Sequence, residues 1–229
     1  MDRVPSNGSP VPPQSRQQRA GDAIRQRSRQ RLVLGAAEVF AECGYAGTTV
    51  NAIAERAGVS LRTLYTAWGS KRRLLRAYVE HTMTGSSTAV TDGTWVSHLQ
   101  DLLDEEARTD PHARMRQIAR IFSDVAERMD LAWRLSRDGA AVDPGVRQDH
   151  AELEQLRRRS LAGLLEGMDD AALRPGLTGD GAVDTLLVIA SPTSYDTLVH
   201  ARGYSLEQFE RWVGDTLVAA ILVPGPPGA

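Results

Sequence analysis

The sequence predicts an all-α protein in which an N-terminal three-helix head is followed by a larger helical bundle. Apolar residues recur at intervals of three and four positions through most of the 229 residues, which is the period of an amphipathic helix. No stretch alternates apolar and polar residues between turn signals, as a half-buried strand does. Prolines, which cannot continue a helix, gather at the two ends of the chain.

Composition divides the chain into four parts. Residues 1–22 are rich in Pro, Ser, Gln and Arg and bury too little apolar surface to offset the entropy of ordering, so we expect a flexible arm. Residues 23–80 form the head, and residues 81–223 form the helical bundle, here called the body. A polar linker at residues 84–93 joins the two, and residues 224–229 are expected to be a disordered tail.

The periodicity and the turn signals place the helices of the head. Helices are predicted over residues 24–43, 50–57, 61–65 and from residue 71 onward. Gly44 stops the first of them, because glycine readily takes the left-handed conformation that ends a helix. The only cysteine, Cys43, ends this apolar helix and is expected to be buried and inert.

In the body, the same reasoning predicts seven helices without an internal repeat. They are expected at residues 95–108, 112–129, 131–137, 145–168, 181–190, 193–201 and 206–223.

The charge of the chain is unevenly distributed. Residues 1–80 hold 13 basic and 6 acidic residues, a net charge of +7, whereas residues 81–229 hold 14 and 23, a net charge of −9. A basic head on an acidic body is typical of a protein that binds nucleic acid through the head alone. A solvated basic arm is the alternative explanation.

Other function classes find little support in the sequence. No apolar run is long enough to cross a bilayer and no secretory signal begins the chain, so we expect a cytoplasmic protein with no membrane partner. The lone cysteine and the scattered histidines offer no metal-ligand spacing, and we expect no metal and no cofactor. No phosphate-binding loop, nucleophile elbow or catalytic grouping indicates an enzyme.

The segment from Thr49 to Tyr65, TVNAIAERAGVSLRTLY, predicts a helix-turn-helix. Gly58 follows the first short helix where a left-handed residue is needed, and Ser60 can cap the second. Val59 between them is an apolar plug that holds the angle between the helices. A plain helical hairpin is the alternative structure for such a segment.

The second short helix is the expected reader of DNA sequence, because a recognition helix places its N-terminal residues on base edges in the major groove. Its candidate contacts are Leu61, Arg62, Thr63 and Tyr65, of which Arg62 has the fork that engages guanine. The next helix begins with Lys71, Arg72 and Arg73. Cations at a helix N-terminus oppose the helix dipole, which indicates that phosphate lies nearby; solvated charges are the alternative.

From Arg31 to Leu75 the chain resembles the tetracycline-repressor (TetR) family of regulators, through AAEVFAECGYAGTTVNAIAERAGVS, then TLY, then SK and LL. More weakly, Asp184–Leu222 resembles the last two helices of a common subgroup, with its SP break and RGYS turn. Two positions depart from the family pattern. Arg62 stands where glycine is frequent, which would alter base preference, and Arg72 replaces a usual acidic residue, which would strengthen phosphate binding.

The resemblance implies a homodimer that binds double-stranded operator DNA and is released by a small-molecule effector bound in the body. It implies that Thr49 caps the second helix near a phosphate and that Lys71 meets another. Together with the turn analysis, the predicted DNA-binding residues are Thr48, Thr49, Ser60, Leu61, Arg62, Thr63, Tyr65 and Lys71.

Two further sets of apolar residues are assigned to the body. A stripe at helical spacing predicts the dimer interface at Val183, Leu186, Leu187, Phe209, Trp212, Val213 and Leu217, with intrachain core as the alternative. A ligand cavity is predicted from Leu99, Leu102, Leu103, Met115, Ile118, Phe122 and Trp133, which are equally explained as core. The remaining rival class is a helical interaction protein without DNA, which would show no salt-dependent duplex binding.

Overall fold

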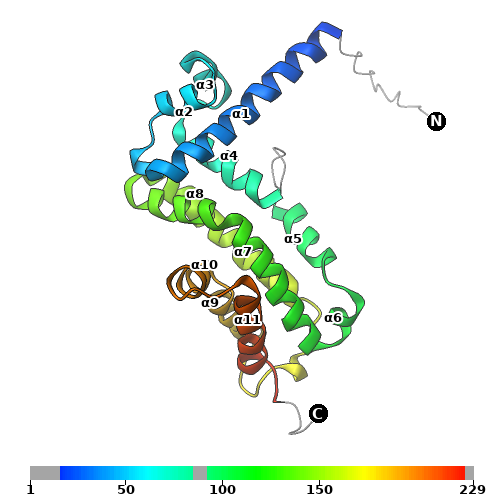
Figure 1. Cartoon of the computed structure of the whole chain (residues 1–229). Helices are drawn as coiled ribbons and strands as arrows, with labels where there is room; N and C mark the ends of the chain where they lie inside the picture. Colours follow the sequence, from blue (N-terminus) through cyan, green and yellow to red (C-terminus); the bar gives the residue numbers. More distant parts are fainter. Residues whose placement is uncertain (1–15, 85–91, 225–229) are drawn as a thin grey trace, which may run out of the picture.

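The computed structural model describes residues 16–84 and 92–224, and over these residues the chain is helical apart from one isolated β-bridge (Figure 1). Helices α1 to α4 form the head at one end, and α7 and α8 run from the head through the body. The expected all-α class is therefore confirmed. Residues 1–15, most of the expected linker (85–91) and residues 225–229 lie outside the described part.

Helix α1 spans Arg16–Gly47 and begins earlier than expected. Residues 16–22, predicted as part of a flexible arm, form its first turns, which suits their content of good helix formers such as Gln, Arg and Ala. Gly44 interrupts it with φ +66°, so the expected stop appears as a bend.

The head is closed by α2 (Val50–Arg56), α3 (Leu61–Ala67) and α4 (Lys71–Thr84) around a buried core. Its largest fully buried side chains are Leu32, Phe40, Ile53, Leu64 and Leu74. Cys43 is exposed, contrary to expectation, because the buried stripe of α1 ends at Phe40 and the chain returns to the core only at Tyr45, beyond the bend.

The first half of the body contains α5 (Asp92–Asp101), α6 (Glu105–Thr109), α7 (Pro111–Val142) and α8 (Pro144–Leu165). Two expected helices, 112–129 and 131–137, are one continuous helix, α7. Asp130 does not break it, because its carboxylate pairs with Arg134 one turn later at 2.7 Å. The single helix expected at 95–108 is divided between α5 and α6.

The second half comprises the 3-10 turn η1 (Asp170–Ala172), α9 (Gly179–Ile189), α10 (Pro192–Tyr195), the π-helical η2 (Asp196–Ala201) and α11 (Leu206–Ile221). Ser205 and Gln208 form a capping box at the start of α11. The bridge between Leu173 and Leu222 ties the end of α11 to the loop after α8. α11 packs along α7 and α9, so the last helices complete the body core.

Within the described residues, no helix has the length and apolar character required to cross a bilayer. The same residues contain no group of three or more His, Cys, Asp or Glu side chains placed to hold a metal ion.

Candidate nucleic-acid interface and cavity

The corner between α2 and α3 has the geometry of a tight helix-turn-helix. Gly58 has φ +61°, the left-handed region, and its N–H donates to the Glu55 carbonyl at 3.0 Å. Val59 donates to the Ala54 carbonyl at 3.0 Å, and Ser60 caps α3 by accepting from the Thr63 N–H at 3.1 Å. Because Ile53 and Leu64 are fully buried, the opposite side of α3 faces outward.

The outward side of α3 carries three of the predicted recognition residues. Leu61 is 39% exposed and Tyr65 is 52% exposed, and Arg62 is also exposed. Thr63 is half-buried and its hydroxyl lies 2.9 Å from that of Ser60. The helix therefore presents a guanidinium, an aromatic ring and an aliphatic chain on one surface.

The two threonines before α2 differ in position. Thr49 caps α2, its hydroxyl accepting from the Ala52 N–H at 3.2 Å, and it is exposed. Thr48 is only 3% exposed, and its hydroxyl donates to the Gly44 carbonyl at 2.7 Å. Thr49 is thus accessible to a phosphate, whereas Thr48 is turned into the bend of α1.

Lys71, the only lysine of the chain, holds together the bend of α1 at Gly44. Its ammonium donates to the carbonyls of Tyr45 at 2.7 Å and Thr48 at 2.9 Å, and lies 4.3 Å from the centre of the Tyr45 ring. Burial lowers its pKa. Lys71 holds α1 to the start of α4, which leaves one of its three N–H donors for a phosphate.

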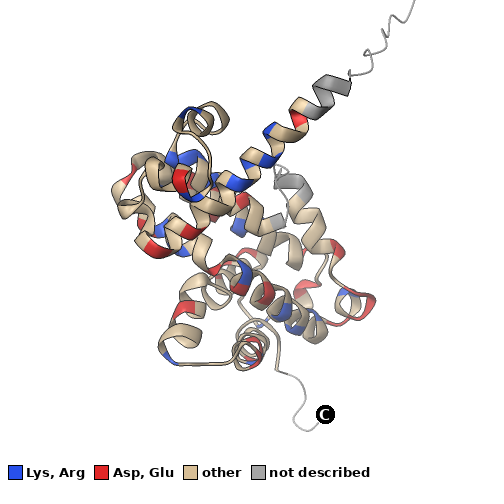
Figure 2. Cartoon of the chain, turned by 45° about the horizontal axis from the view of Figure 1, so that its top comes forward, with Lys and Arg blue, Asp and Glu red and all other residues tan. Residues whose placement is uncertain are grey.

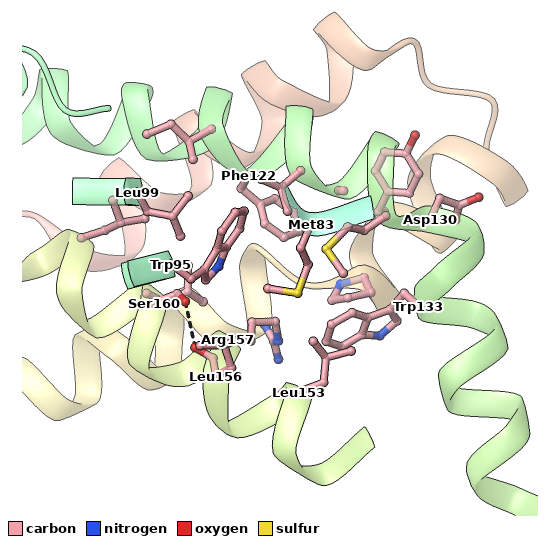
Figure 3. A pocket seen from close by; sticks show the side chains of 18 of the residues that line it. Met83, Trp95, Leu99, Phe122, Asp130, Trp133, Leu153, Leu156, Arg157 and Ser160 are labelled. Atoms are coloured by element: carbon pink, nitrogen blue, oxygen red, sulfur yellow. Dashed lines mark hydrogen bonds between the residues drawn. The ribbon is translucent and has the colours of Figure 1, made fainter. Parts of the chain in front are cut away.

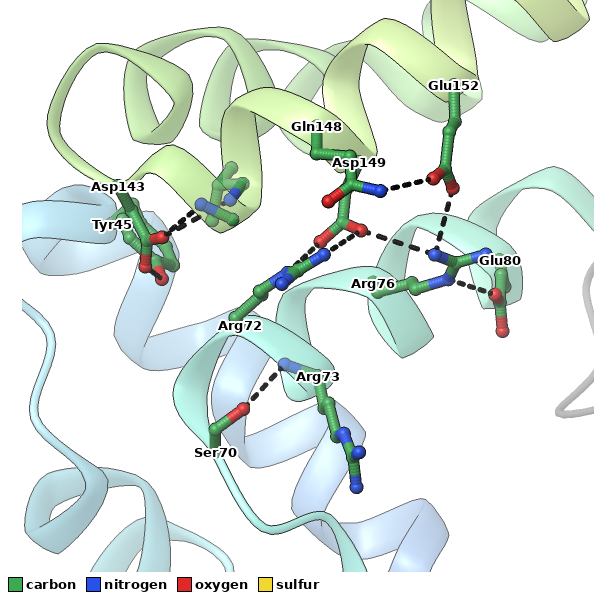
Figure 4. Close-up of polar contacts among 12 residues, drawn as sticks. Tyr45, Ser70, Arg72, Arg73, Arg76, Glu80, Asp143, Gln148, Asp149 and Glu152 are labelled. Carbon is green, nitrogen blue, oxygen red and sulfur yellow. Dashed lines mark hydrogen bonds and ion pairs between the residues drawn. The ribbon is translucent and has the colours of Figure 1, made fainter.

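Arg72 joins the head to the body (Figure 4). Its guanidinium makes a two-pronged contact with Asp149 of α8, at 2.6 and 2.8 Å, and this hydrogen bond raises the pKa of Arg72. Arg76 donates to Asp149 at 3.2 Å and to Glu152 at 3.1 Å. The expectation that Arg72 would add phosphate affinity is not met, because its carboxylate partner lies within the chain. Arg73 is the exposed cation of this helix start.

A second link between head and body is the hydrogen bond from the Tyr45 hydroxyl to Asp143, at 2.6 Å, beside the N-terminus of α8. This bond lowers the pKa of Asp143. The pKa of Tyr45 is raised mainly by burial and in second place by the same bond. Tyr45 is 4% exposed and Asp143 is half-buried, so the bond is partly shielded from water.

We expect Tyr45→Phe to destabilise the protein by roughly 1.5–3 kcal/mol at pH 7, the usual range for a hydrogen bond to a charged group. Because the pKa of Asp143 is lowered in the folded state, this stability is present above the ordinary pKa of the carboxyl and is lost as the pH falls through the folded value. Urea unfolding of both proteins at pH 7 and in acid measures it. A difference that persists unchanged in acid would contradict the assignment.

The body contains a mainly apolar cavity between α7, α8 and the ends of α4 and α5 (Figure 3). Its volume is about 90 Å³. Its wall includes Met83, Trp95, Leu99, Phe122, Trp133, Leu153, Leu156 and Tyr195. Ligand pockets usually enclose about 300–1,000 Å³, so a ligand of ordinary size must widen this one.

Polar side chains lie at several places around the cavity wall. Asp130 accepts from Arg134 at 2.7 Å, and its other oxygen lies 3.1 Å from the His200 ring nitrogen. The buried Nε of Arg134 has no hydrogen-bond partner among the described residues. Arg157, over the Trp133 ring at 5.9 Å, donates to the carbonyls of Leu187 and Ala190.

Three of the seven residues predicted to line a cavity do line it: Leu99, Phe122 and Trp133. Leu103, Met115 and Ile118 are buried elsewhere in the core, and Leu102 is 43% exposed. Sequence reasoning missed Met83 and Tyr195, which come from helices assigned to other roles. The spacing of apolar residues along each helix predicts that such side chains are buried, but not whether they line the cavity or pack in the core.

The residues predicted for a dimer interface lie on α9 and α11. Five of them, Val183, Leu186, Phe209, Val213 and Leu217, are at most 6% exposed within the single chain. Leu187 and Trp212 are half-buried. The outward sides of the same helices present Val188, which is 71% exposed, and Ala219.

Comparisons with known proteins agree with a helix-turn-helix head on a helical body. Residues 32–78, which contain α2, α3 and parts of α1 and α4, match the family model described as bacterial regulatory proteins, tetR family. The HTH-type transcriptional repressor AcnR of Corynebacterium efficiens is 25% identical over 162 residues, which are 64% of this chain and 86% of the relative.

Solved structures share the fold of most of the chain. NalD, the secondary repressor of the MexAB-OprM multidrug efflux pump in Pseudomonas aeruginosa, has a TM-score of 0.64 at 16% identity and covers 86% of this chain and 98% of its own. FadR of Bacillus subtilis, in complex with stearoyl-CoA, has a TM-score of 0.61 at 21% identity and covers 84% and 98%. The head of the chain, residues 32–78, is thus a DNA-binding domain of the tetR family of bacterial regulatory proteins.

Proposed function

We propose that the protein represses transcription as a homodimer that reads a palindromic operator through α3 and releases it when an apolar small molecule enters the body. The observation that carries the DNA-reading part is the outward side of α3, where Leu61, Arg62 and Tyr65 are exposed beside the corner at Gly58. Arg62 supplies sequence readout, because its guanidinium fits the two acceptors of guanine.

Arg62→Ala tests this proposal. We expect the variant to lose about 1–3 kcal/mol of discrimination at one base position of each half-site while its fold is retained, since the side chain is exposed. Binding is measured on the operator, isolated from DNA flanking the gene, and on operators with each single base changed. Arg56→Ala is the matched control, because Arg56 pairs with Glu38 and Glu42 on the α1 side of α2. An equal loss on every duplex would contradict direct readout by Arg62.

The dimer is proposed to form through the outward sides of α9 and α11. The recognition helices of a twofold reader must lie about 34–36 Å apart or at multiples of that distance, so a rigid interface is required. Val188, Ile189, Trp212 and Ala219 offer accessible apolar surface on these two adjacent helices. The inward residues Phe209, Val213 and Leu217 support this surface from within the chain.

The effector is proposed to bind the cavity of the body. Its aromatic and aliphatic wall favours an apolar ligand, with the group around Asp130 and Arg134 at one end to orient a polar substituent. Such a ligand acts only if it binds the DNA-free conformation more tightly than the DNA-bound one. Trp95 and Trp133 lie in the wall, so their fluorescence reports binding while operator release is measured on the same samples.

A further inference from the structure

The first half of α1 is a basic helix that extends beyond the packed part of the head (Figure 2). Among residues 21–47 of α1, whose burial is described, Leu32 is the first buried one, and the preceding stretch from Arg16 to Arg31 is about 24 Å of helix at 1.5 Å per residue. Between residues 22 and 31 the sequence contains four arginines and one acidic residue, Asp22. The function of the recognition helix does not account for this segment.

The four arginines divide into two pairs by their contacts. Arg31 donates to the Gly58 carbonyl at 3.3 Å, and Arg29 lies over the Trp68 ring at 4.7 Å. Arg25 pairs with Asp22 on the exposed surface, and Arg27 makes no hydrogen bond or ion pair with any described residue. The second pair is therefore available to an external partner, since an exposed ion pair is weak and easily exchanged.

The composition of this segment favours a polyanion as that partner. Ala23 and Ile24 are its only apolar residues between positions 22 and 31, so it lacks the apolar stripe that a membrane-surface helix or a groove-binding helix needs. Arginine on both sides of a helix suits phosphate groups, which accept its forked donors.

Its position relative to α3 identifies the polyanion. Arg31 contacts the corner at the start of α3, and Trp68, beneath Arg29, caps the end of α3. The basic helix thus leaves the head beside both ends of the recognition helix. A duplex bound by α3 continues past this flank, and its phosphates carry one negative charge per about 1.7 Å of helix axis.

We propose that residues 22–31 of α1 form a second DNA contact, in which Arg25 and Arg27 bind phosphates of the duplex beside the operator half-site without reading its sequence. This proposal rests on the proposed function, because it requires α3 to hold the duplex. It differs from that function in its signature: phosphate contacts position a protein but carry no sequence information, and each releases counterions.

The test compares the full-length protein with the double variant Arg25→Gln, Arg27→Gln on the operator and on a scrambled duplex over a range of salt concentrations. The slope of log affinity against log salt should become shallower by about 0.9 for each lost phosphate contact, or up to about 1.8 per protomer. The change should be equal on both duplexes. Arg25→Lys, Arg27→Lys should keep the wild-type slope, because the charge is retained.

A matched control is Arg120→Gln, Arg174→Gln, which removes two exposed arginines from the body. It should leave the slope unchanged. An unchanged slope in the α1 variant, or an equal change in the body control, would overturn the proposal. If instead the wild-type protein binds no duplex at low salt, the proposed function itself fails, which is a distinguishable result.

Discussion

Phe209→Ala should destabilise the body by about 3–5 kcal/mol, the range for removal of a large aromatic side chain from a packed core. Phe209 is fully buried, and its ring lies 6.1 Å from that of Phe122, 5.2 Å from that of Tyr195 and 6.3 Å from that of Trp212. Truncation leaves a cavity where α7, α10 and α11 meet. Thermal unfolding should shift downward by about 2–4 °C per kcal/mol for a chain of this size.

The dependence of this loss of stability on protein concentration shows whether Phe209 belongs to the core of the protomer or to the dimer interface. Stability that comes from association changes with protomer concentration, whereas stability from the intrachain core does not. We therefore expect the loss in Phe209→Ala to be the same in dilute and in concentrated protein. A loss that disappears as the protein is concentrated would place Phe209 in the interface, as the sequence stripe suggested.

Val188→Asp should weaken the dimer by at least a hundredfold, about 2.8 kcal/mol or more at about 1.4 kcal/mol per tenfold. Val188 is 71% exposed in the protomer, so the substitution adds a charge where the proposed interface would remove it from water. The stability of the protomer should change by less than about 0.5 kcal/mol, as is usual for an exposed position. Sedimentation equilibrium measures the association, and operator binding should fall with it.

Val142→Asp is the control for this prediction. Val142 is also apolar and 61% exposed, but it lies at the end of α7, outside the proposed interface. This variant should remain dimeric. A Val188→Asp protein that stays dimeric at the same concentrations would show that the two protomers meet elsewhere.

The parts of the site that sequence reasoning predicted correctly are those set by local signals. The corner at Gly58 follows from one glycine, one apolar residue and one capping serine within three positions, and the structure places them accordingly. The start of α1 was less well predicted, because residues 16–22, expected in a flexible arm, form its first turns.

Long-range partners could not be predicted in this way. Lys71 and Arg72 look alike in the sequence as cations at a helix start, yet one binds carbonyls at the bend of α1 and the other binds Asp149, 77 positions away. The apolar stripe of α11 likewise predicts burial but not whether the covering surface belongs to the same chain. Only the packing of α11 on α7 and α9 decides that.

Helix α4 connects the contacts between head and body with the wall of the cavity. Lys71 and Arg72 at its start hydrogen-bond to α1 and α8, while Met83 near its other end forms part of the cavity wall. These ends are separated by about 18 Å of continuous helix. On the proposed function, we expect a molecule that displaces Met83 to tilt the start of α4, so that the reading surfaces of the two protomers change their separation while both heads stay folded.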